Sequence, residues 1–151
     1  MPGISTCPQV MASLVAWFST VPLNDPSDVR YGPQPTNSEA REVISVGLTG
    51  PLEDAAVENT TAQEGLMPSY RENYTIHCAV AVLQGDGGPQ PAAERAFVIL
   101  AACTALVNAN SNLAGDALNL SVASWALRED QTTGGISQRL RFDVNVDAFM
   151  Q

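Results

Sequence analysis

The C-terminal segment of the chain, residues 140–150, most constrains what the chain can fold into. Apolar and polar residues alternate there without a break. The apolar positions are Leu140, Phe142, Val144, Val146 and Ala148, and the polar positions are Arg141, Asp143, Asn145 and Asp147. Because successive side chains of a strand point to opposite faces, the pattern predicts a strand in a sheet with one face in a core and one face polar.

The remaining segments predict two helices and several strands. Apolar residues at helical spacing predict helices over residues 8–20 and 91–108, and the second is apolar on nearly every side. We expect strands over residues 28–32, 42–48, 72–83, 118–127 and 136–150. Residues 50–70 show no period and predict a long loop, and the polar residues 128–135 predict the loop of a C-terminal hairpin.

These elements predict one α+β domain over residues 1–151. We expect a mixed, largely antiparallel sheet of about four to five strands, with two main helices packed on it and a long C-terminal β-hairpin. The chain is 45% hydrophobic and carries a net charge of -9, with seven Arg and no Lys. This charge disfavours tight binding of nucleic acid, and the absence of Lys removes P-loop and Schiff-base chemistry.

Three cysteines, Cys7, Cys78 and Cys103, lie far apart in apolar segments, which predicts free buried thiols in a reducing compartment. The apolar run Val10–Phe18 has no basic residue before it. It therefore predicts neither a signal peptide nor a membrane span, and we expect a soluble, intracellular protein with no membrane partner.

Candidate catalytic and ligand-binding motifs are incomplete. His77 and Cys78 are neighbours in a predicted strand and so point to opposite faces, where they cannot act as base and nucleophile. The residues from Asp143 to Asp147 resemble the start of a calcium loop but lack its Gly and its final Glu. The turn at residues 85–88 lacks the Lys of a phosphate loop. We therefore expect no catalytic, cofactor-binding or metal-binding residues, and a protein that is not an enzyme.

The order of the predicted elements resembles that of the tail terminator (tail completion) proteins of long-tailed, siphovirus-type bacteriophages. The resemblance covers essentially the whole chain and rests on four segments. These are Val29-Arg30-Tyr31-Gly32-Pro33 as a short strand with a Gly-Pro turn, Glu72-Asn73-Tyr74-Thr75-Ile76, Ala92-Ala93-Glu94-Arg95-Ala96, and the terminal strand from Arg139 to Val146. The acidic segment 51–69 departs from the pattern.

The resemblance implies a virion protein that is assembled in the host cytoplasm and lies at the head-tail junction. It implies a ring, generally of six copies, that caps the tail tube, stops its polymerisation and offers a joining surface to the head connector. The implied partners are other copies of the chain, the major tail tube protein and the head-tail connector or neck protein. Genomic DNA passes through the ring without tight binding.

Ten residues are candidates for the interface or the channel. They are Arg128, Glu129, Asp130, Gln131, Thr132, Thr133, Arg139, Arg141, Asp143 and Asp147. The predicted loop 128–135 is a hypothesis for the contact with tube or connector. The acidic residues of the terminal strand are a hypothesis for a negative channel that repels DNA phosphates.

Two other functions remain open from the sequence. The first is another neck component, such as a head completion or adaptor protein, which would share the ring but contact the portal side. The second is a small ligand-binding domain or enzyme that uses Cys78 or Cys103 as a nucleophile, which would require an activated thiolate.

Overall fold

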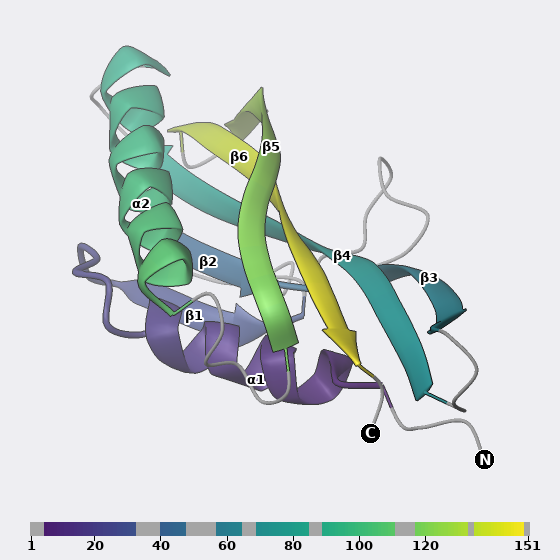
Figure 1. Cartoon of the computed structure of the whole chain (residues 1–151). Coiled ribbons are helices and arrows are strands. Elements are labelled where there is room, and N and C mark those ends of the chain that lie inside the picture. Colours follow the sequence, from purple (N-terminus) through teal and green to yellow (C-terminus); the bar gives the residue numbers. More distant parts are fainter. Residues whose placement is uncertain are drawn as a thin grey trace.

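The computed structural model describes residues 5–32, 40–47, 57–64, 69–84, 89–110, 117–132 and 135–149 (Figure 1). It contains two helices, α1 (Cys7–Phe18) and α2 (Pro89–Ala109). The strands of these residues are β1 (Ser27–Tyr31), β2 (Glu42–Val46), β3 (Val57–Glu64), β4 (Ser69–Gln84), β5 (Ala117–Thr132) and β6 (Gly135–Phe149).

The six strands form one mixed sheet, in which five follow the order β1-β2-β4-β6-β5 and β3 pairs with β4 beside this path. β1 and β2 are parallel, and the other pairs are antiparallel. β4 is long enough to pair with β2 along one half and with β3 along the other. The predicted fold class is confirmed: an α+β fold with a mostly antiparallel sheet, two helices and a long C-terminal hairpin made by β5 and β6.

Both helices pack on one face of the sheet, which we call the helix face. The even-numbered residues of β4 and β6 between Tyr74 and Val82 and between Gln138 and Ala148 are buried on this face. α1 contributes Val10, Leu14 and Phe18 at helical spacing, and the ring of Phe18 meets that of Phe142 edge-on at 6.0 Å. The predicted alternation of the last strand therefore places its apolar residues in the core.

The N-terminus of α1 is fixed to the sheet by a buried carboxylate. Glu72 is fully buried, and its Oε1 accepts hydrogen bonds from the backbone N–H and the hydroxyl of Thr6, both at 2.8 Å. Thr6 is the N-cap residue but makes no side-chain cap of its own. A negative charge at this end of a helix also interacts favourably with the helix dipole, so β4 caps α1 from a distance.

A second buried carboxylate fixes α2. Glu42 of β2, only 3% exposed, accepts hydrogen bonds from Nε and Nη2 of Arg95 at 2.9 and 3.0 Å. The backbone N–H of Asn24 donates to the same carboxylate at 2.7 Å. Burial opposes ionisation of Glu42, but the Arg95 and Asn24 contacts outweigh it and hold its pKa below the usual range. This ion pair joins α2, β2 and the segment before β1.

By length and composition alone, α2 could cross a membrane, with a mean hydropathy of 1.5 over 18 residues. In the described fold it lies along the sheet instead. It buries Ala92, Ala96, Ile99, Leu100, Cys103 and Val107 against the core. Packing along the sheet explains why α2 carries small and apolar residues on more than one side.

Two predicted loops are wrong in part. The long loop predicted over residues 50–70 contains β3 and the first residues of β4, and the predicted hairpin loop 128–135 is strand as far as Thr132. β3 has the polar sequence VENTTAQE, without the apolar alternation of a half-buried strand. Its strand conformation follows from backbone pairing with β4. Such pairing with another segment leaves no pattern in the sequence of β3 itself.

A bulge in β5 changes which residues face the helices. The register with β6 shifts between Val122 and Ser124. Before the shift Leu120 and Val122 lie opposite the core residues of β6, and after it Trp125 and Leu127 do. One extra residue in a strand reverses the later alternation, so the bulge turns Trp125 towards α2.

Candidate interaction surface

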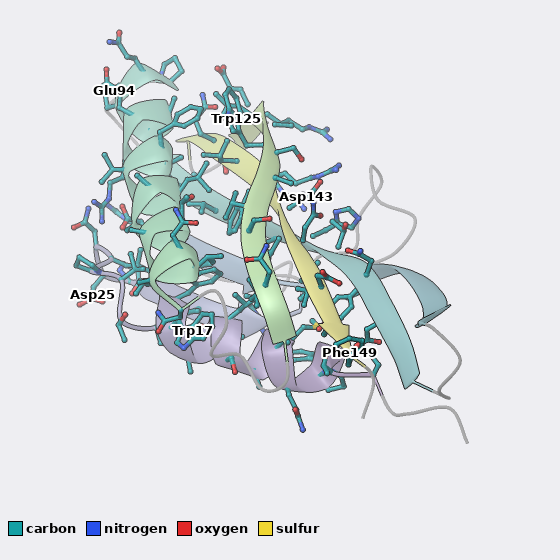
Figure 2. All side chains as sticks on the ribbon, in the orientation of Figure 1. Trp17, Asp25, Glu94, Trp125, Asp143 and Phe149 are labelled. Atoms are coloured by element: carbon teal, nitrogen blue, oxygen red, sulfur yellow. The ribbon has the colours of Figure 1, made fainter. Side chains whose placement is uncertain are left out.

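The face of the sheet opposite the helices, which we call the outer face, carries the polar residues of the predicted site. It is buried at β2, where Val43 and Ser45 are covered, and becomes exposed towards β5. On β4 and β6 it is formed by the odd-numbered residues, as the alternation predicts. Figure 2 shows the labelled Asp143 on β6 between Trp125 and Phe149.

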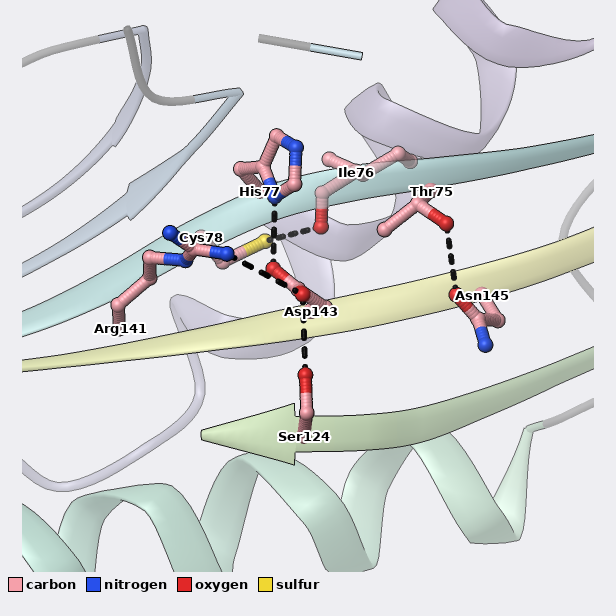
Figure 3. Close-up of polar contacts among 8 residues, drawn as sticks. All are labelled: Thr75, Ile76, His77, Cys78, Ser124, Arg141, Asp143 and Asn145. Atoms are coloured by element: carbon pink, nitrogen blue, oxygen red, sulfur yellow. Dashed lines mark hydrogen bonds and ion pairs between the residues drawn. The ribbon is translucent and has the colours of Figure 1, made fainter. Parts of the chain in front are cut away.

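A polar cluster on this face is centred on Asp143 (Figure 3). Nδ1 of His77 donates to Oδ1 of Asp143 at 2.7 Å, and Oγ of Ser124 donates to Oδ2 at 3.0 Å. Nη2 of Arg141 lies 3.5 Å from the same Oδ2. The three neighbours come from β4, β5 and β6, and His77 lies directly opposite Asp143 in the β4–β6 register. Asp143 therefore ties together the three strands of the outer face.

The electrostatics of Asp143 follow from these contacts. Burial would raise its pKa, but the hydrogen bonds from His77 and Ser124, with the charges of His77 and Arg141, outweigh burial. The pKa of Asp143 is therefore lowered, and the side chain is an anion at neutral pH.

The cluster contains Ser, His and Asp but does not have the connectivity of a catalytic triad. In a triad the serine hydroxyl donates to the histidine, which acts as the base. Here Ser124 and His77 both bind the carboxylate of Asp143, on separate oxygens. A carboxylate with a lowered pKa is a poor base for a hydroxyl, so these contacts order the sheet and do not activate Ser124.

Three arginines gather on the outer face nearer the hairpin turn. Arg128 of β5 lies directly opposite Arg139 of β6, and Arg141 is two residues further along β6. Their cross-strand neighbours on the outer face are small, namely Ala126 opposite Arg141, and Ala79 and Ala81 of β4 opposite Arg141 and Arg139. We call Arg128, Arg139 and Arg141 the arginine patch. Three of the seven arginines of an acidic chain thus share one face of one hairpin.

The other predicted interface residues are distributed differently. Glu129 lies opposite Gln138 on the helix face, where Nε2 of Gln138 donates to its Oε2 at 3.0 Å. Asp130, Gln131 and Thr132 belong to β5 opposite Ser137, Ile136 and Gly135, whereas Thr133 lies outside the described residues. Asp147 pairs with Asn73 on the outer face, far from the arginine patch. The ten residues therefore do not form one site.

The outer face is not uniformly negative, as the hypothesis of a negative channel assumed. In β4, β5 and β6 the described charged side chains of this face are the three arginines of the patch, Asp143 and Asp147. Asp143 is already bound by His77, Ser124 and Arg141. A negative channel lining would therefore rest on Asp147 and on other acidic residues of the chain.

An apolar surface lies on the helix face of β5, on the side of the sheet opposite the arginine patch. Trp125 is 59% exposed, and its ring meets that of Phe97 on α2 edge-on at 4.9 Å. Leu127, two residues further along β5 on the same face, is also exposed. Exposed large apolar side chains that lie together are typical of interaction surfaces. Sequence reasoning missed this feature because the bulge decides the direction of Trp125.

The thiols are the remaining candidates for chemistry. Burial raises the pKa of Cys103 to about 12 and raises that of Cys78 further, and burial with the nearby Glu72 raises the pKa of Cys7. All three cysteines are free, and Cys78 and Cys103 are buried. Protonated thiols are weak nucleophiles, which counts against an enzyme that uses Cys78 or Cys103. Among the described residues, no group of three or more His, Cys, Asp and Glu could hold a metal ion.

Comparisons with known proteins give similarity to solved structures only. No protein-family model matches the chain, and no curated protein gives a significant match. Among solved structures, the chain is similar to a chain of "Virion of native gene transfer agent (GTA) particle", with a TM-score of 0.46 and 14% sequence identity. The similarity covers 96% of this chain and 92% of that chain.

Proposed function

We propose that the chain is a structural protein of a phage-like virion, and more specifically a tail terminator. The observation that carries the proposal is the order of elements: α1, the short β1, the long β4, the apolar α2 and the β5–β6 hairpin. This is the order in which the sequence resembles tail terminators. Gly32, with a positive φ of 95°, supports the turn expected at the end of β1.

The proposed work of the protein is binding. A ring of about six copies needs a heterologous interface, in which one patch of each subunit fits a different patch of the next. The ring would cap the last ring of tube protein and receive the head connector on its other side. The exposed surface around Trp125 and the arginine patch support a protein whose function lies in contacts with other proteins.

The first experiment measures the mass of the purified protein by light scattering, alone and with tubes of the major tail protein from the same genome. We expect a closed ring of about six subunits, or a monomer that forms such a ring at tube ends. A host expressing a null mutant should contain tails of uncontrolled length. A protein that stays monomeric and ignores tube ends would contradict the proposal, and tails of normal length that fail to join heads would favour another neck component.

The end of the hairpin remains our candidate for the contact with tube or connector. Because Asp130 pairs with Ser137, residues 131–136 can be replaced by Asn-Gly, which forms a two-residue turn and keeps the register. We expect this shortened hairpin to fold and to form rings but to lose length control or head joining. Normal tails and normal joining would remove the hairpin end from the interface.

The negative channel also stays a proposal. Replacing Asp143 and Asp147 with Arg should slow DNA ejection and leave tail assembly intact, because phosphates would bind a positive lining. The Asp143 change also removes the His77 contact, so the single Asp147→Arg variant is the better first test. Unchanged ejection kinetics in both variants would count against a role for this face in DNA passage.

A further inference from the structure

The two ends of the main sheet path are edge strands with different surfaces. β1 ends the path on one side and β5 on the other, and each has one strand partner within the described residues. The free edge of a strand presents backbone N–H and C=O groups that can pair with another chain, and natural proteins often protect such edges with charges or proline.

The edge of β5 lacks this protection along its regular part. From Ser121 to Leu127 the strand has no charged residue and no proline. After the bulge, residues from Ser124 to Arg128 pair with β6 in unbroken register and are all exposed. This regular edge is five residues long, the same length as β1. With the faces matched, residues 125–128 can pair with residues 28–31 in an antiparallel register, which sets Trp125 opposite Tyr31 and Arg128 opposite Asp28.

The side chains of the two edges match face by face. On the helix face, β5 presents Trp125 and Leu127, and β1 presents Val29 and Tyr31, which lie beside the core residues Ile44 and Val46 of β2. Tyr31 is 57% exposed, nearly as much as Trp125. Joining the edges would cover both aromatic rings.

The charges on the outer face are also complementary. β5 presents Arg128 there, with Arg139 behind it on β6. β1 presents Asp28, which an ion pair of 3.3 Å links to Arg30, and the exposed Asp25 precedes the strand. β1 also presents Arg30 on this face, so with Asp25 and Asp28 its edge carries one net negative charge, opposite in sign to Arg128.

We propose that β1 of one copy adds to the β5 edge of the next copy, so that the sheet continues from subunit to subunit. This inference rests on the proposed ring and names the surfaces that form it. Because the two edges differ, the contact is heterologous and repeats around a ring until the rotation closes. Arg128 contacts Asp28 and Asp25 of the neighbouring copy on the outer face, and Trp125 and Leu127 contact Tyr31 on the helix face.

A second copy fits this edge better than DNA does. Phosphates would satisfy the arginine patch but would leave Trp125 and Leu127 exposed. The chain as a whole carries a net charge of -9, which repels a polyanion beyond the patch itself. A strand of the same chain satisfies the backbone edge, the apolar face and the charges together.

A charge exchange tests the proposed pairing. Arg128→Asp and Asp28→Arg are each expected to raise the concentration for half-assembly at least about tenfold, and the double variant should restore most of the loss. Light scattering over a dilution series and the amount of protein bound at tube ends are the measurements. Glu94→Arg, on the exposed side of α2, changes the net charge as Asp28→Arg does and should leave assembly unchanged. Circular dichroism verifies that each variant is folded.

The outcomes separate this inference from the proposed function. If wild-type rings form and cap tubes but the single variants assemble normally, or the double variant does not recover, the pairing of β1 with β5 is wrong and the terminator proposal stands. If the wild type neither assembles nor binds tube ends, both fail. Binding to duplex DNA that Arg128→Asp abolishes, with assembly unchanged, would assign the arginine patch to DNA and overturn the inference.

Discussion

The two faces of β4 and β6 are formed by alternate residues of the same strands, but they have different roles. On the helix face, every residue of β6 from Leu140 to Ala148 that points inward is an apolar residue in a closed core. On the outer face, the residues between them form the Asp143 cluster and the arginine patch. Burial restricts the helix face to apolar residues that stabilise the fold. The outer face is not restricted in this way and can hold residues whose arrangement lowers the stability.

The largest expected effect comes from the core of the helix face. Phe142→Ala removes a fully buried ring that touches Phe18 and should lower the free energy of unfolding by about 3–5 kcal/mol. Phe149→Ala, on the same strand but 42% exposed, is the matched control and should cost less than about 1 kcal/mol. Urea denaturation measures both. Equal losses would mean that the strand end is packed as tightly as its centre.

The next effect comes from the ion pair at the edge of the helix face. Arg95→Met leaves the buried carboxylate of Glu42 without its cation and should cost about 2–3 kcal/mol, less than for a fully buried pair because Arg95 is partly exposed. The pKa of Glu42 is lowered in the folded protein, so this contribution is present above its unfolded pKa and is lost as the pH falls through the folded pKa.

The double variant Glu42→Gln with Arg95→Met separates the charge from the packing. It should recover part of the loss, because no uncompensated charge is then buried. If the double variant were less stable than Arg95→Met at neutral pH, the Glu42 carboxylate would stabilise the fold even without Arg95, through its contact with Asn24.

A smaller effect is expected at the centre of the outer face. Asp143→Asn keeps the shape but weakens the hydrogen bonds from His77 and Ser124, and should cost about 1–2 kcal/mol at pH 7. Because the pKa of Asp143 is lowered by folding, its contribution is full above the ordinary value of 3.8 and disappears as the pH falls through the folded pKa. The difference in stability between the wild type and the variant should therefore shrink as the pH falls below 3.8 and through the folded pKa of Asp143.

Measurement of both proteins between pH 7 and pH 3 gives this difference directly, and other acidic groups cancel in the comparison. Ser124→Ala removes one of the hydrogen bonds and should show a smaller loss with the same dependence on pH. A difference between wild type and Asp143→Asn that does not shrink as the pH falls well below 3.8 would contradict the role given to the charge of Asp143.

The same two faces explain how much could be predicted from the sequence. The strand predicted over residues 140–150 and its buried side followed from alternation alone. Strict alternation of apolar and polar residues fits a strand whose apolar side faces a core. β3 did not, because its polar sequence is set in place by β4. The arginine patch and the contacts of Asp143 depend on the register of β5, which the bulge between Val122 and Ser124 shifts. The alternating strands and the C-terminal hairpin were therefore predictable, whereas the polar strand β3 and the side-chain neighbours set by the register of β5 were not.

The smallest expected effect lies in the arginine patch and sharpens the contrast between the faces. Arg139 lies opposite Arg128, and like charges at directly opposite positions destabilise a sheet by a few tenths of a kcal/mol to about 1 kcal/mol. Arg139→Ser should therefore leave the free energy of unfolding unchanged or raise it by up to about 0.5 kcal/mol. Arg141→Ser, which loses the contact of 3.5 Å with Asp143, is the control that should cost stability. If Arg139→Ser instead lowered the free energy of unfolding by more than about 1.5 kcal/mol, Arg139 would stabilise the fold. If the substitution cost nothing, Arg128 and Arg139 would be retained for a contact outside the subunit.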